Sequence, residues 1–231
     1  MTLPMQDFDS VQRVDLIKEM CTGRRVLHLG CTNWPYTEDA ITSKMLLHFD
    51  LEKVAAEIVG IDADQAGIAI LERHGSTNLI QGDLERLESC PLDGPFDVIV
   101  AGEVIEHVSN PGLFLDGIKR FMGEGSDLVL TTPNAYCAMR FVYYGLRGRR
   151  GKAEPVHPDH VAYYSYSTLK LLVERHGFEV TRFYFYDLGT EHRRFVRWFL
   201  RIINDIAVAF VPQWSDGVIA ICKLKAPSDA A

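Results

Sequence analysis

Short apolar runs alternate with amphipathic stretches along this 231-residue chain. The apolar runs at 25–29, 57–62, 78–83, 96–101 and 126–131 are bounded by glycine or polar residues, as buried parallel strands are. Further strands are predicted at 178–186, which alternates like an edge or antiparallel strand, and at 218–224. Helices are expected at 8–20 (with Asp9 or Ser10 as N-cap), 38–57, 66–74, 111–122 and 168–176. This alternation predicts a doubly wound α/β fold: a mostly parallel seven-stranded sheet with helices on both faces and an antiparallel last strand.

Three segments do not belong to that alternation. No repeat or linker divides the chain, so we expect one domain over residues 1–231, with lid or cap segments at 1–22, 138–165 and 192–213. The segment 138–165 is rich in Arg, His and Tyr and too long for an ordinary connection. The 192–211 stretch is expected to be a cap or a homodimer face, with membrane contact as the alternative.

Composition and charge limit the classes of binding partner and the compartment that we expect. The formal net charge of -7 argues against broad binding of nucleic acid. Five scattered cysteines fit reduced thiols, and no secretory signal is visible, so we expect a cytoplasmic protein. The longest apolar stretch, at 195–211, contains two arginines, an asparagine and an aspartate, which argues against a transmembrane segment.

The predicted strand ends indicate a nucleoside site. Gly30 would let a ligand approach the backbone, Asp62 could accept hydrogen bonds from ribose hydroxyls, and Asp83 with Leu84 could bind and cover an adenine ring. The first turn, HLGCTNWP, lacks the glycine fingerprint and the lysine that cradle phosphates. The ligand should therefore be a nucleoside without a phosphate chain, which disfavours NAD and ATP.

The motifs VLHLG, VGID, GDL, FDVIVAGEVIEHV, LTTPN and HGFEV, in this order, resemble those of the class I S-adenosylmethionine-dependent methyltransferases. The resemblance runs from about Arg25 to Leu224 and is greatest to the small-molecule and sugar O-methyltransferases. It implies S-adenosylmethionine as cofactor, bound by Gly30, Cys31, Asp62, Ala63, Asp83, Leu84 and Ala101. The chain departs from the family at His28, where an acid is usual, and at Thr32 and Trp34, where glycines are usual.

The candidate chemistry lies in PFDVIVAGEVIEHVSNP, residues 95–111. Glu103, Glu106 and His107 stand at i, i+3 and i+4, which places them on one face if this segment is helical. His157 and His160 could close over them from the lid. One interpretation makes His160 or His107 a general base that Glu106 orients. The resemblance implies another, in which Glu103, Glu106, His107 and His160 hold a divalent metal such as Mg²⁺ or Mn²⁺; in a third, Glu106 merely caps a helix.

The sequence therefore predicts a methyltransferase that modifies a hydroxyl of a sugar or another polar small molecule. The alternative that is not an enzyme is a non-catalytic nucleoside-binding or scaffold protein with the same fold. A scaffold has no need for two acids and a histidine beside the sheet. Within enzymes, an RNA 2′-O-methyltransferase is the alternative, which the acidic balance disfavours.

Overall fold

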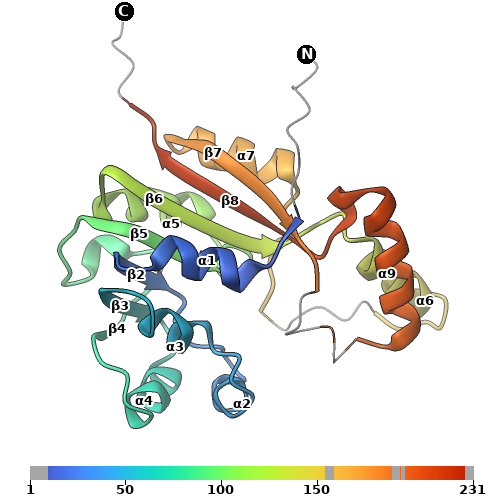
Figure 1. Cartoon of the computed structure of the whole chain (residues 1–231), viewed down its shortest axis with the longest axis horizontal. Coiled ribbons are helices and arrows are strands. Elements are labelled where there is room, and N and C mark those ends of the chain that lie inside the picture. Colours follow the sequence, from blue (N-terminus) through green and yellow to red (C-terminus); the bar gives the residue numbers. More distant parts are fainter. Residues whose placement is uncertain (1–9, 154–158, 189–192, 194–195, 227–231) are drawn as a thin grey trace, which may run out of the picture.

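One mixed sheet forms the centre of the computed structural model, which describes residues 10–153, 159–188, 193 and 196–226 (Figure 1). Within these residues the strand order is β1-β7-β8-β6-β5-β2-β3-β4. The strands are β1 (Ser10–Val11), β2 (Arg25–Leu29), β3 (Glu57–Asp62), β4 (Leu79–Gln81), β5 (Phe96–Gly102), β6 (Met122–Pro133), β7 (Phe178–Tyr186) and β8 (Gly217–Leu224). All neighbours pair in parallel except β8, which is antiparallel to both β6 and β7. The predicted seven-stranded sheet with its antiparallel last strand is confirmed, and the two-residue β1 adds an edge.

Several helices differ in their bounds from those that the apolar pattern predicted. They are α1 (Arg13–Cys21), α2 (Thr37–Thr42), α3 (Leu47–Glu52), α4 (Gln65–Arg73), α5 (Pro111–Ile118), α6 (Ala138–Gly148), α7 (Tyr166–Arg175) and α9 (Trp198–Phe210). The single helix expected at 38–57 is wrong, because Lys44, at a φ of 57°, separates α2 from α3. Gln12 rather than Asp9 or Ser10 is the N-cap of α1, since Ser10 and Val11 pair with β7. The expected loop after residue 138 begins instead with α6.

Two apolar layers hold the helices to the sheet. On one face, Phe114 of α5 and Leu169 of α7 join the larger core cluster. On the other face, Ile17 of α1 and Leu51 of α3 pack against Val98 and neighbouring strand residues. Because successive strand residues point to opposite faces, the near-continuous apolar strands supply both layers. No described helix is long and apolar enough to cross a membrane.

The strand order places three strand ends side by side. β2 lies between β3 and β5, with Leu29 in register with Ile61 on one side and Ala101 on the other. The chain continues from β2 outward through β3 and β4, and then returns to β5 on the opposite side of β2. Ligands bind beyond the carboxyl ends of the strands at such a switch in strand order. The fold therefore brings the residues that follow β2, β3 and β5 to one place.

Candidate functional site

A cavity of about 500 Å³ opens beyond these strand ends, in the size range of small-molecule sites. Its walls come from the loops after β2, β3, β4 and β5, from α1 and α3, and from the segment that carries His160. Gly30, Cys31, Asp62, Ala63, Asp83 and Leu84 all line it. Ala101 does not; it is fully buried in the core, and the next residue, Gly102, takes its place in the wall.

Asp62 anchors the loop that follows β2. Its Oδ2 accepts hydrogen bonds from the Thr32 backbone N–H at 2.8 Å and from Thr32 Oγ1 at 2.9 Å. Its Oδ1 accepts from the Asp64 backbone N–H at 2.9 Å. A carboxylate offers about four acceptor positions, so roughly one remains for a ligand. Thr32 therefore shares the carboxylate with any ligand that binds to Asp62.

Gly30 makes the close turn between β2 and the cavity. Its φ of 73° lies in the left-handed region, and a Cβ there would clash with the Val104 side chain. Only glycine meets both conditions without strain. The backbone of the first motif can therefore lie directly against the loop after β5.

His28 forms an unexpected pair with His48 of α3. Their Nδ1 atoms are 3.1 Å apart and the rings stack, with both side chains almost fully buried. The Glu52 carboxylate, 3.5 Å from His48 Nε2, favours a proton on that nitrogen. His48 then accepts at Nδ1, His28 donates from its own Nδ1, and His28 Nε2 is left as an acceptor.

Burial keeps this pair neutral. Desolvation, followed by the charges of His48 and Arg13, holds the pKa of His28 well below its usual value. Desolvation lowers the pKa of His48 to about 4. The cavity wall thus carries a neutral acceptor at His28.

The loop after β5 is a turn, so the helix expected to carry Glu103, Glu106 and His107 on one face is wrong. Glu103 adopts a φ of 58°, which ends the strand, and its backbone N–H donates to the Thr131 backbone oxygen at 3.0 Å. Its carboxylate accepts from Thr131 Oγ1 at 3.2 Å and from the Tyr186 hydroxyl. These contacts direct Glu103 toward β6 and β7.

Glu106 is fully buried beneath the cavity. Its Oε2 accepts a hydrogen bond from Thr132 Oγ1 at 2.9 Å, while Oε1 has no hydrogen-bond partner among the described residues. Burial, and next the negative charge of Glu103, raise the pKa of Glu106 well above its usual value. Asn110 is the N-cap of the next helix, α5, and the Glu106 side chain bonds Thr132 instead, so the helix-cap interpretation of Glu106 is wrong. Thr132, its partner, was not singled out from the sequence.

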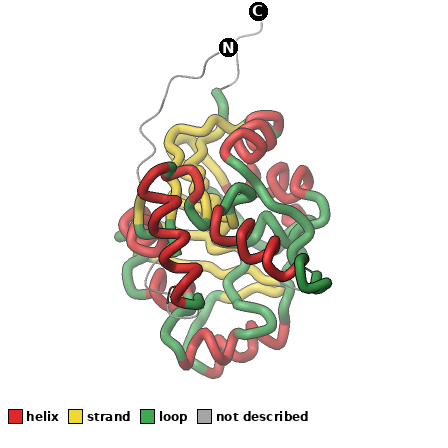
Figure 2. Tube along the Cα trace, turned by 90° about the vertical axis from the view of Figure 1, so that its right-hand side faces the viewer, coloured by secondary structure: helices red, strands yellow, loops and turns green. Residues whose placement is uncertain are grey.

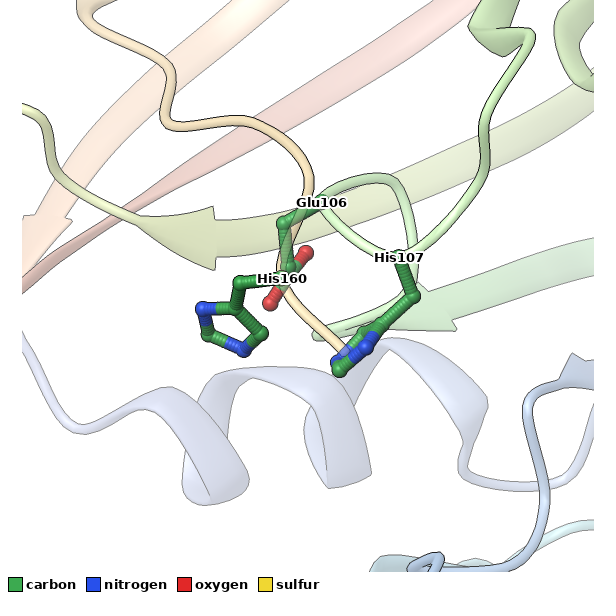
Figure 3. A group of neighbouring side chains, drawn as sticks. All are labelled: Glu106, His107 and His160. Carbon is green, nitrogen blue, oxygen red and sulfur yellow. The ribbon is translucent and has the colours of Figure 1, made fainter. Parts of the chain in front are cut away.

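Backbone contacts bring His160 to this carboxyl group. The Glu106 carbonyl accepts from the N–H groups of Val161 at 2.8 Å and Ala162 at 3.3 Å, so the lid segment is held to the turn itself. His107 and His160 then meet edge to face, with ring centroids 4.6 Å apart. His107 Nδ1 lies 3.5 Å from the Asp159 carboxylate. Figure 3 shows the three side chains converging, and both histidines line the cavity.

The same cluster could hold a metal ion. Glu106, His107 and His160 each offer one ligand atom, and these atoms lie within 4.8 Å of one another. Glu103 lies outside this group in the described part of the chain, since Thr131 and Tyr186 hold its carboxylate. Two imidazoles and one carboxylate suit Mn²⁺ or Zn²⁺ better than Mg²⁺. His157, which was expected to close over the cluster from the lid, lies outside the described residues.

The methyltransferase-domain family matches residues 15–182 of the chain. A probable S-adenosylmethionine-dependent methyltransferase of Mycolicibacterium smegmatis is 30% identical over 162 residues, which are 69% of this chain and 54% of that protein. The mitochondrial ubiquinone biosynthesis O-methyltransferase of Rattus norvegicus is 28% identical over 120 residues, covering 49% of this chain and 32% of the relative. The chain thus spans about half or less of the length of these curated relatives.

Solved structures share the fold at low identity. An S-adenosylmethionine-dependent methyltransferase of Archaeoglobus fulgidus superposes with a TM-score of 0.52 at 22% identity, covering 91% of this chain and 94% of that one. The magnesium protoporphyrin IX methyltransferase of Synechocystis, solved with bound S-adenosylhomocysteine, gives 0.58 at 12% identity, covering 93% of this chain and 83% of that one. Both confirm the methyltransferase-like arrangement of the sheet.

Proposed function

Because the chain belongs to the class I S-adenosylmethionine-dependent methyltransferases, we propose that it transfers a methyl group to a hydroxyl of a sugar or another polar small molecule. The observation that carries this proposal is the convergence of Glu106, His107 and His160, whose two histidines line the same cavity as Asp62. Asp62 marks the cofactor side of that cavity, and the two imidazoles mark the acceptor side. A scaffold protein would gain nothing from this buried polar cluster.

The cavity residues fit adenosylmethionine. Asp62 would bind the ribose and Asp83 with Leu84 the adenine, and all three residues line the cavity. Arg13 is the one lysine or arginine among the described lining residues. A phosphate chain would need more positive charge, so this lining suits a ligand without one. Gly102 and Gly30 bring backbone rather than side chains to the centre of the cavity. When bound, adenosylmethionine supplies an electrophilic methyl group on a sulfonium.

The chain's own residues would then align the acceptor and move its proton. The cofactor, held by Asp62 and the backbone at Gly30 and Gly102, would supply the methyl group to the acceptor oxygen and leave as the neutral thioether. We assign the hydroxyl proton to the His160 imidazole, with His107 as the second candidate and Glu106 as the group that positions them. Alignment can contribute about 7 to 11 kcal/mol, and a general base about 10²- to 10⁴-fold in rate. The lid segment 159–164 would serve both needs by closing over the acceptor.

A methyl-transfer screen tests the proposal. Purified protein is incubated with adenosylmethionine carrying a tritiated methyl group and with pools of sugars, glycolipid precursors, phenols or RNA. The proposal expects label in the sugar or glycolipid pool. Label in the phenol pool alone or the RNA pool alone would keep the transferase and refute the acceptor class. Binding of adenosylhomocysteine without transfer to any pool would favour the non-catalytic alternative.

A further inference from the structure

The helix α9 carries a line of large apolar side chains on its exposed face. Trp198, Ile202, Ile206 and Phe210 are 69%, 49%, 56% and 82% exposed. They recur every fourth residue, so they form one stripe about 18 Å long. Monomeric proteins seldom leave such a stripe in water without a binding role.

Contacts on the inward face of α9 prevent the helix from rotating about its axis. Leu200 and Asn204 are buried, and the Asn204 side chain donates hydrogen bonds to both carboxylate oxygens of Asp187, at 2.8 and 2.9 Å. Leu200 packs with Met139 of α6 in a separate apolar cluster. Rotating the stripe inward would break the Asn204 contacts. The outward direction of the stripe is therefore fixed by the fold.

The neighbouring helix α6 extends this surface and adds positive charge. The two helices contact each other and lie side by side on the same flank (Figures 1 and 2). Phe141 of α6 is 80% exposed. The exposed Arg149, Arg150 and Lys152 follow at its carboxyl end, and none forms an ion pair with another described residue. The chain as a whole carries a net charge of -7, so this cluster is a local reversal.

From this combination we propose that the α6–α9 flank docks on an anionic lipid surface. An apolar stripe beside a group of cations is the pattern of peripheral membrane binding: the stripe enters the headgroup boundary, and the cations meet the lipid phosphates. Asp205, the acid on the exposed face of α9, is bound through both oxygens by Arg193 and so repels the surface little.

A second copy of the chain fits this flank less well. A two-fold dimer through the stripe would bring the same flank against itself. The α9 of that second copy would offer the cations no unpaired acid, since Asp205 is already paired with Arg193. An anionic bilayer supplies the missing negative charge.

Co-sedimentation with vesicles tests the docking. Full-length protein is mixed with vesicles of phosphatidylcholine alone, or of phosphatidylcholine and phosphatidylglycerol in equal parts. Binding is expected to the anionic vesicles only and should weaken as salt rises. The Ile202→Asp/Ile206→Asp variant should lose about tenfold or more in vesicle affinity. The Arg149→Glu/Arg150→Glu variant should lose the preference for the anionic vesicles.

A matched control is Leu171→Asp, which places the same charge on an apolar residue of α7 that is 49% exposed. It should bind vesicles as the wild type does, and unchanged adenosylhomocysteine affinity should show that every variant is folded. Wild-type protein that stays in the supernatant, or binds both vesicle types equally, would overturn the proposal. So would a dimer in analytical ultracentrifugation that the Ile202→Asp/Ile206→Asp variant dissociates, since a second copy would then cover the stripe.

Discussion

Replacing Asp62 with asparagine should weaken cofactor binding. The carboxylate already accepts three hydrogen bonds, two from Thr32 and one from the Asp64 backbone. With about four acceptor positions available, one ribose hydroxyl can bind directly. A second can bind only if Thr32 Oγ1 releases its bond. Asparagine keeps the shape of the side chain but removes the charge and one acceptor oxygen.

The expected loss follows from that geometry. A hydrogen bond to a charged group contributes about 1.5 to 3 kcal/mol net. Losing one ribose bond should therefore raise the dissociation constant of adenosylhomocysteine by about 10- to 150-fold. Thr32→Val removes only the competing hydroxyl and keeps the backbone bond. We expect that variant to bind within roughly threefold of the wild type, since one acceptor bond is exchanged for another.

Isothermal titration calorimetry with adenosylhomocysteine measures these affinities directly. A matched control is Asp97→Asn, because the Asp97 carboxylate also accepts a backbone hydrogen bond, from Arg25 at 2.8 Å, but stands at the other end of β5. It should leave the affinity unchanged. An Asp62→Asn variant that binds within twofold of the wild type would refute the assignment of Asp62 to the ribose.

The other predictions concern the acceptor side and the histidine pair. Glu106→Gln should lower kcat by about 10- to 100-fold with unchanged cofactor affinity, because the imidazoles lose the carboxyl group that positions them. An equal loss of affinity would indicate a structural role. Excess EDTA should leave the rate unchanged if His160 acts as a base, whereas a loss that Mn²⁺ restores would assign the cluster to a metal. The His28–His48 pair should make the protein acid-sensitive, because lowered histidine pKa values stabilise the fold above about pH 6.5 and that stability is lost as the pH falls toward 4. His48 alone should account for about 3 kcal/mol of the free energy of unfolding that is lost between pH 6.5 and pH 4, as measured by urea titration. A His48→Gln variant that loses the same free energy of unfolding over this range would contradict this.

The sheet could be predicted because each strand is recognisable from its own short stretch of sequence. Each buried strand reads as a short apolar run, and the order of these runs with helices between them restricts the connections to a few topologies. That Gly30, Asp62 and Asp83 lie together in the cavity wall could be predicted for the same reason, since each stands at or just after the end of a strand. Which residue at the end of β5 lines the cavity was less predictable: Ala101 was expected, but Gly102 lines it.

The acceptor side depended on contacts between distant residues. The spacing of Glu103 and Glu106 suggested a helix, but Thr131 and Tyr186 hold Glu103 with a positive φ and so stop helix formation. The partner of Glu106, Thr132, comes from β6, and the partner of His28 comes from α3. Such pairings are fixed by packing across the sheet, and nothing in the local sequence reveals them. Even so, the expected meeting of Glu106, His107 and His160 is what the structure displays.

The central claim is that cofactor and acceptor are handled by different sides of one cavity, with His160 on the acceptor side. The most direct test compares His160→Ala with the wild type in single-turnover methyl transfer and in calorimetric binding of adenosylhomocysteine. Our account predicts a transfer rate lowered by about 10²- to 10⁴-fold and a dissociation constant within twofold of the wild type. A near-normal transfer rate, or a rate and an affinity that fall together, would contradict it.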